Sequence, residues 1–308
     1  MLWAQAAAMG VRLDKVLADS GGVALRHDVL RTVPEYELAW AVRAGHVLRP
    51  LPRTFLLPGV VADPVAVIGA AMTYAGVPAA VSHLSALRLW GLPVPEASWV
   101  HLMTGETRHL RGAPGVRVHR REGFGLEPPE VVTRVGLPVT RIEDAIVDSW
   151  PLLDGEAKRA PAITAVAMRM TTPQRLSEAL ERAPRLAGRR HLVRLIGLLD
   201  VGCRSPLELW GHDHVFVGRP FAGLRRQVAV RLEDRTVYLD LLDEQTGLNI
   251  ELDGAAYHSS RQDRERDLRR DAALTALGFT VVRYSAARLY REPQIVRAEV
   301  LRMLTRRR

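Results

Sequence analysis

Apolar residues recur at helical spacing in the first part of the chain, and the pattern then changes to alternation. It predicts three short helices between residues 11 and 45 and two strands at residues 47–49 and 54–57, joined by a turn at 50–52. The apolar positions are Leu13, Val16 and Leu17 in the first helix, Leu25, Val29 and Leu30 in the second, and Leu38, Ala41 and Val42 in the third. Three helices followed by a hairpin is the order of a winged helix, so residues 1–60 are predicted to form one, with the turn as its wing.

The pattern is mixed in the middle of the chain. Two helical stretches, at residues 65–76 and 81–90, precede strands in which apolar and polar residues alternate. We therefore predict a mixed α/β middle domain over residues 61–152. Residues 153–203 keep amphipathic helical spacing and are predicted to form a helical connector.

From Ser205 onward helical and strand patterns alternate, which predicts an α/β domain over residues 204–308. Ser205 and Pro206 are suited to the N-cap and the first position of a helix. The predicted elements are a helix to residue 217, strands at 224–231, 236–242 and 247–253, a helix at 261–277, a strand at 280–284 and a helix at 292–304. For the whole chain the prediction is an α/β fold class, α+β overall.

Composition narrows the class of protein. The chain has 308 residues, of which 47% are apolar and 25% charged, as expected for a globular protein of two or three domains. Its single cysteine excludes a disulfide framework within the chain, and the most apolar stretch, residues 65–76, is too short to span a bilayer. We therefore expect a cytoplasmic protein without a membrane segment.

The net charge of +9 favours an anionic partner such as DNA, although it comes almost entirely from arginine. Such arginine usage equally reflects a GC-rich genome. Net charge alone therefore does not distinguish a nucleic-acid-binding protein from one whose arginine content reflects only the base composition of its genome.

Three acidic residues lie within apolar strands of the C-terminal domain. Asp240 follows Val237-Tyr238-Leu239, and Glu251 and Asp253 come at the end of the next strand. Carboxylates in buried strands are costly unless a positive charge compensates them. Mg²⁺, with Mn²⁺ as the alternative, needs only one or two carboxylates plus phosphate oxygens. We predict a metal site formed by Asp240, Glu251 and Asp253, with His258 beyond the following glycine turn as a proton-transfer group.

These residues belong to a series of ordered motifs. The series consists of Ser205-Pro206-Leu207-Glu208, Asp240, Glu251-Leu252-Asp253-Gly254, His258, Asp267 to Asp271 and Gly278 to Arg283. It resembles the very-short-patch-repair endonuclease-like branch of the PD-(D/E)XK nucleases over residues 204–300. The resemblance implies a restriction-endonuclease-like core that cleaves DNA, with Asp240 as the first carboxylate, His258 as the histidine after the turn, and Glu208 facing the metal.

The sequence departs from the wider superfamily at one position. No lysine follows Lys158, and Asp253 stands where the superfamily lysine would be. Because an acid cannot supply that positive charge, His258, Arg270 or Arg283 must do so. The absent lysine also leaves open a descendant that binds DNA without cutting it.

Two of these positions also have purely structural interpretations. Glu208 near a helix N-terminus favours the helix dipole, and we weigh that slightly above a metal role. Asp267 and Arg270, three residues apart on a helix, fit a solvated ion pair better than catalytic groups.

The N-terminal domain resembles the winged helix of abortive-infection antitoxins of the AbiEi type. The similarity continues through Ser82-His83-Leu84-Ser85-Ala86 and Trp90-Gly91-Leu92. It implies DNA binding, with Arg43 on the third helix and Arg49 and Arg53 on the wing meeting phosphates. Tyr36 and Trp40, one turn apart, are interpreted as core residues.

The preferred prediction is a Mg²⁺-dependent DNA endonuclease or nickase acting in repair or phage defence. The alternative is a non-catalytic, antitoxin-like transcriptional regulator that keeps a decayed nuclease fold. Besides DNA, a protein of a toxin–antitoxin or defence system is a candidate partner, and the sequence does not indicate an oligomeric state.

Overall fold

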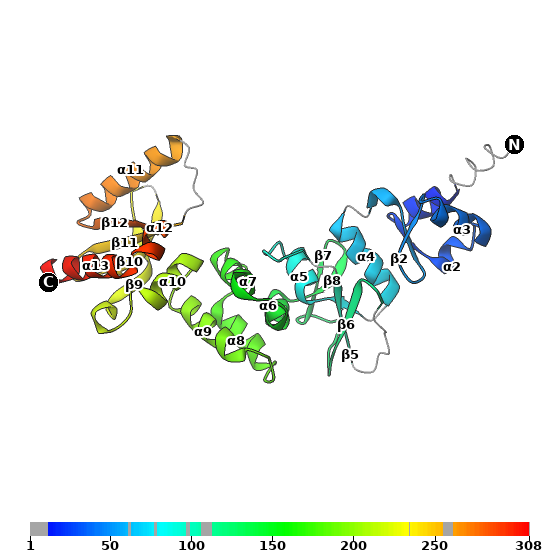
Figure 1. Ribbon diagram of the computed structural model, residues 1–308, viewed down its shortest axis with the longest axis horizontal. Coiled ribbons are helices and arrows are strands. Elements are labelled where there is room, and N and C mark those ends of the chain that lie inside the picture. Colours follow the sequence, from blue (N-terminus) through cyan, green and yellow to red (C-terminus); the bar gives the residue numbers. More distant parts are fainter. Residues whose placement is uncertain are drawn as a thin grey trace. The chain divides into compact units, whose positions relative to one another are not determined.

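The computed structural model describes residues 12–60, 63–76, 79–96, 99–105, 113–233, 235–254 and 261–307 (Figure 1). The chain divides into two compact units. The N-terminal unit comprises residues 1–165 and 175–189, and the C-terminal unit comprises residues 166–174 and 190–308. Helices combine with three sheets, which confirms the predicted mixed fold class. The boundaries predicted at residues 60, 152 and 203 stay predictions.

The first part of the N-terminal unit is a small helical core against a three-stranded sheet. Its elements are a helix at residues 12–19, β1 (Val23–Leu25), α2 (Arg26–Val29), α3 (Glu35–Arg43), β2 (Leu48–Leu51) and β3 (Thr54–Leu56). The strands are ordered β1-β3-β2. Leu17, Val29 and Leu38 are buried together with Phe55 of the sheet, so the helices pack on one face of the hairpin.

Two details differ from the prediction. Leu25, assigned to the second helix, lies in β1 opposite Thr54, because the edge of the hairpin offers its backbone a partner. The turn between β2 and β3 is at Pro52 and Arg53 rather than at residues 50–52, and Arg53 has a φ of 61°. Pro50 is tolerated within β2 because that strand is at the sheet edge, where a missing N–H costs little.

The second part of the N-terminal unit is a five-stranded sheet with helices. Its elements are η1 (Pro58–Val60), α4 (Pro64–Ala75), β4 (Ala80–Val81), α5 (His83–Leu89), β5 (Val100–Gly105), β6 (Val116–Arg121), β7 (Val131–Arg134), β8 (Leu137–Thr140) and α6 (Ile142–Ser149). The strands are ordered β6-β5-β4-β8-β7, and β5 and β6 are parallel. The two predicted helices correspond to α4 and α5.

Four helical segments follow. They are η2 (Trp150–Leu152), α7 (Gly155–Ala167), α8 (Pro173–Glu181) and α9 (Arg189–Asp200). Leu176 and Leu180 of α8 and Leu192 and Leu199 of α9 are buried, which is the amphipathic pattern that the sequence predicts.

The C-terminal unit contains a four-stranded mixed sheet covered by helices. Its further elements are α10 (Pro206–His214), η3 (Arg219–Phe221), β9 (Leu224–Arg231), β10 (Thr236–Asp243), β11 (Leu248–Asp253), α11 (Arg261–Ala276), β12 (Thr280–Ser285), α12 (Ala286–Arg291) and α13 (Pro293–Arg307) (Figure 1). The strands are ordered β12-β11-β10-β9, with β11 and β12 parallel and the other pairs antiparallel. The predicted strands all form, and α12 was not predicted.

Each face of this sheet has its own apolar core. On one face Leu239 and Leu242 of β10 pack with Leu274 of α11. On the other face Leu241 and Ile250 pack with residues of α10, α12 and α13. Because both faces of this sheet are covered, a carboxylate in a central strand has little access to water. A negative charge on the acids of β10 and β11 is therefore costly unless a cation or a hydrogen-bond donor compensates it. No helix among the described residues has the length and apolar character needed to cross a membrane.

Candidate active site

Asp240 lies within β10 at the point where the strand's pairing is interrupted. The ladder with β11 ends at Leu241, opposite Ile250. In the ladder with β9, Leu239 and Leu241 are paired but Asp240 between them is not. The carboxylate accepts a hydrogen bond from the backbone N–H of Leu252 at 3.0 Å. Asp240 lies inside the strand, as predicted, because β10 continues to Asp243.

Gln227 of β9 bridges two of the predicted acids. Its Nε2 donates to Oδ1 of Asp240 at 3.1 Å and lies 3.4 Å from Oε2 of Glu208. Gln227 has a φ of 48°, although it is neither a glycine nor in a turn. A residue other than glycine whose backbone is held in the left-handed region is strained by about 1–3 kcal/mol, and such residues cluster at functional sites. Gln227 was not predicted from the sequence.

Glu208 stands in the first turn of α10 beside Asp240. Ser205 caps this helix by accepting from the Glu208 N–H at 3.1 Å, and Oε2 of Glu208 accepts from the Arg204 N–H at 3.1 Å. Burial, followed by the negative charge of Asp240, raises the pKa of Glu208 to about 7. Glu208 is thus buried against a second carboxylate, which the helix dipole alone does not require.

Glu251 of β11 is next to Asp240 across the strands. It is buried, and Arg270 of α11 grips it through two hydrogen bonds of 2.9 and 3.1 Å. Asn249 donates to the same carboxylate at 2.7 Å. Burial, and then the charge of Glu251, raises the pKa of Asp240, which places the two carboxylates in one electrostatic site.

Arg270 is the cation of this site. Besides Glu251 it binds the backbone oxygen of Tyr238 at 3.0 Å, so it joins α11 to both central strands. The interpretation of Arg270 as a solvated partner of Asp267 was wrong, because its partner is the buried Glu251. Arg283, the other candidate to replace the lysine, pairs with Asp271 at 2.7 Å.

The remaining predicted site residues are outside this group. Asp253 is exposed at the end of β11. His258 lies outside the described residues. Within the described residues, Glu208, Asp240, Glu251 and Asp253 provide no set of three ligand atoms that all lie within 4.8 Å of one another. Two carboxylates on adjacent strands, Asp240 and Glu251, therefore form the centre of the candidate site.

Residues 221–304 match the restriction endonuclease-like family REase_MTES_1575. The matched segment contains Gln227, Asp240, Glu251 and Arg270, and its end includes most of α13. The match is consistent with a PD-(D/E)XK nuclease domain and indicates a nuclease-type function with DNA as the substrate.

Comparison with solved structures gives a likeness to the crystal structure of the RV2827C protein from Mycobacterium tuberculosis. The two chains are 16% identical, with a TM-score of 0.45, over 62% of this chain and 78% of the other. The search of curated proteins gives no match.

The predicted DNA-contacting arginines of the N-terminal unit are all exposed. Arg43 ends α3, Arg49 lies in β2, and Arg53 forms the turn between β2 and β3. Tyr36 of α3 is 67% exposed, so its interpretation as a core residue was wrong, whereas Trp40 packs against the small helical core. Tyr36 and Arg43 thus lie on α3, and Arg49 and Arg53 lie on the β2–β3 hairpin.

Proposed function

We propose that the C-terminal unit is a Mg²⁺-dependent DNA endonuclease or nickase of the very-short-patch-repair type, acting in repair or phage defence. The observation that carries this proposal is the juxtaposition of the buried Glu251 and the partly buried Asp240 at the break in a β-ladder, within the segment that matches a nuclease family. Hard carboxylate oxygens whose charge is opposed by burial fit the donor set that Mg²⁺ prefers.

In this proposal each residue has its own role. Asp240 and Glu251 would be the two protein ligands of Mg²⁺, because the three predicted acids do not converge within 4.8 Å once Asp253 is included. A bound ion would supply charge stabilisation at the scissile phosphate and would lower the pKa of its water. Gln227 orients Asp240, and Glu208, with its pKa near 7, is a group that can hold or release a proton at neutral pH. His258 stays a predicted proton-transfer group.

Arg270 takes over part of the role of the superfamily lysine. It brings a fixed positive charge into contact with Glu251 from the helix that covers the sheet. With Mg²⁺ held by Glu251, the Arg270 guanidinium would be available to a phosphate oxygen, and arginine suits this role because its planar fork matches phosphate geometry.

Plasmid nicking tests the proposal. The full chain, incubated with supercoiled plasmid, is expected to give open-circle or linear DNA with Mg²⁺ or Mn²⁺ and none with excess EDTA, because the two acids act only through the ion. Glu251→Gln removes one metal-binding charge and is expected to stop cleavage, whereas Glu265→Gln, on the exposed side of α11, is expected to cleave at the wild-type rate.

A specific observation favours the alternative function, a DNA-binding regulator without nuclease activity. Both oxygens of Glu251 are already occupied by Arg270, and the sequence after Lys158 has no lysine to activate water. DNA binding by the full chain with no cleavage under any divalent ion would establish this alternative and reject the endonuclease.

We further infer that residues 12–56 bind DNA as a winged helix. The element order helix-strand-helix-helix-strand-strand and the exposed Arg43, Arg49 and Arg53 support this. Each phosphate contact contributes about 0.9 to the slope of log affinity against log salt. Changing the three arginines to alanine is expected to lower the magnitude of this slope by about 3, as measured by fluorescence anisotropy with a labelled duplex.

A matched control removes the same charge elsewhere. Arg159, Arg185 and Arg190 are also exposed, and their triple alanine variant is expected to leave the slope close to that of the wild type. Equal slopes for the two triple variants would mean that the DNA contact is general electrostatic attraction rather than a surface on α3 and the β2–β3 turn.

A further inference from the structure

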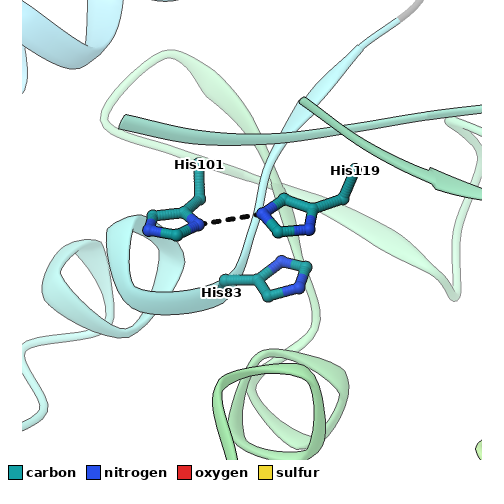
Figure 2. A group of neighbouring side chains, drawn as sticks. All are labelled: His83, His101 and His119. Atoms are coloured by element: carbon teal, nitrogen blue, oxygen red, sulfur yellow. Dashed lines mark hydrogen bonds between the residues drawn. The ribbon is translucent and has the colours of Figure 1, made fainter. Parts of the chain in front are cut away.

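Three histidines meet in the N-terminal unit, on the sheet that carries β5 and β6. His83 opens α5, His101 lies in β5 and His119 in β6 (Figure 2). Their ligand-capable nitrogens all lie within 4.8 Å of one another, and among the described residues they are the one group of three metal-binding side chains that does so. Nδ1 of His101 and Nε2 of His119 are 2.9 Å apart and face each other (Figure 2).

The fold brings these residues together in two steps. β5 and β6 are parallel, and Met103 stands opposite His119, so His101, two residues before Met103, points to the same face as His119. The start of α5 is fixed to β5 because the Ser82 N–H donates to the His101 oxygen and the His101 N–H donates to Ser85 Oγ, each at 2.9 Å. The third ring is thereby held beside the other two.

The backbone at His83 is strained in a way that packing alone does not explain. His83 has a φ of 49°, in the left-handed region that side chains other than glycine rarely adopt. Such a conformation costs about 1–3 kcal/mol and is retained where it positions a functional group. Here it directs an imidazole toward two others instead of toward an apolar partner.

We propose that His83, His101 and His119 bind a divalent transition-metal ion of the Zn²⁺ class. Three imidazoles are a donor set that favours Zn²⁺, Co²⁺, Ni²⁺ or Cu²⁺ over Mg²⁺, which prefers oxygen. Tetrahedral Zn²⁺ with bonds of about 2.0–2.1 Å separates its nitrogen ligands by about 3.3 Å, close to the 2.9 Å between His101 and His119. The His101 and His119 nitrogens therefore need to move apart by only about 0.4 Å to bind one ion.

The environment keeps all three rings in the neutral form that binds metals. Burial, then the neighbouring histidines, lowers the pKa of His83 well below its usual value, and burial lowers those of His101 and His119 to about 4. Nδ1 of His83 is 3.0 Å from Ser82 Oγ, a hydroxyl of the kind that hydrogen-bonds the second nitrogen of metal-binding histidines.

Metal binding has to change the orientation of the His83 ring, and two arginines lie near the three histidines. The His83 and His119 rings are stacked with centroids 3.6 Å apart, so His83 has to turn about its side-chain bonds for its lone pair to converge with the others. Arg117 and Arg121 are the cations nearby, and Arg121 is paired with Asp144 and Asp148. Three ligands leave a fourth position, which water or an anionic group would fill.

The test uses the full chain, freed of any affinity tag and stripped of metal with a chelator. Titration with Zn²⁺ followed by calorimetry is expected to show one tight site per chain, and X-ray absorption of the Zn²⁺-loaded wild type is expected to show three imidazole ligands. Loss of a residue that only hydrogen-bonds to a metal ligand lowers metal affinity by about 10–100-fold. Loss of a ligand itself should cost more, so His101→Gln and His119→Gln are each expected to weaken Zn²⁺ binding by about 100-fold or more.

Controls separate this site from the rest of the chain. His191→Gln removes an exposed histidine and is expected to bind Zn²⁺ as the wild type does. Asp240→Asn is expected to keep the Zn²⁺ site, which makes the proposal independent of the proposed nuclease. Fewer than three imidazole ligands in the wild type, or unchanged affinity in folded His119→Gln, would overturn it. The absorption result needs no variant, so it decides even if the variants do not fold.

Discussion

Asp240→Asn is expected to lower metal-dependent DNA cleavage by more than about 100-fold without lowering the stability of the C-terminal unit. Loss of a residue that merely supports a metal ligand costs about 10–100-fold, and loss of a ligand's charge should exceed this. Asparagine can still accept from the Leu252 N–H, and Gln227 can present its oxygen to the new amide, so the hydrogen bonds of Asp240 have replacements.

The effect of Asp240→Asn on stability distinguishes an acid that acts in catalysis from one that stabilises the fold. Burial and the Glu251 carboxylate both oppose a negative charge at Asp240 in the metal-free protein. A neutral isostere removes this opposition, so the variant should unfold at the same denaturant concentration as the wild type or a higher one. This is the trade-off typical of active sites.

Nicking rates and urea unfolding, measured on the same preparations, provide the readout. Asp267→Asn is the matched control, because Asp267 is an exposed aspartate on α11, and it is expected to change neither quantity. An Asp240→Asn protein that cleaves plasmid at the wild-type rate would remove Asp240 from the active site. A variant that loses cleavage only because it unfolds would point to a structural role.

The sheet of the C-terminal unit could be predicted from sequence because local signals agree there. Ser205 and Pro206 mark a helix start, and Ser205 does cap α10. β10 and β11 have 8 and 6 residues, which is shorter than a typical helix, so their apolar runs indicate strands. The cost of burying Asp240 and Glu251 indicated these two acids before their positions were known.

Other parts of the sites depend on contacts that no local pattern encodes. Gln227 is one polar residue in a strand, and only the pairing of β9 with β10 brings it to Asp240. The partner of Arg270 follows from how α11 lies on the sheet, whereas sequence spacing suggested Asp267. His83, His101 and His119 come together only when β5 pairs with β6, and their wide separation along the chain resembles no short metal-binding motif.

The Arg270–Glu251 pair gives the second large expected effect, this time on stability. Arg270→Gln is expected to lower the free energy of opening of β10 and β11 by about 3–5 kcal/mol, because removing one partner of a buried ion pair leaves the other charge buried without compensation. The side chains are only 18% and 9% exposed, so water cannot replace the guanidinium. Amide hydrogen exchange of these strands, followed by mass spectrometry, measures the change.

The neighbouring Arg269 offers a matched control on the same helix. Its pair with Glu265 has side chains that are 77% and 59% exposed, and surface pairs contribute only about 0–1 kcal/mol, so Arg269→Gln should leave exchange in β10 and β11 nearly unchanged. Equal loss of protection in the two variants would show that Arg270 acts through the helix and not through Glu251. Mg²⁺ adds a second readout, the gain in protection from amide exchange when the ion is added. This gain should be larger in Arg270→Gln, where the ion compensates an unpaired carboxylate, than in the wild type, where it has to displace the guanidinium.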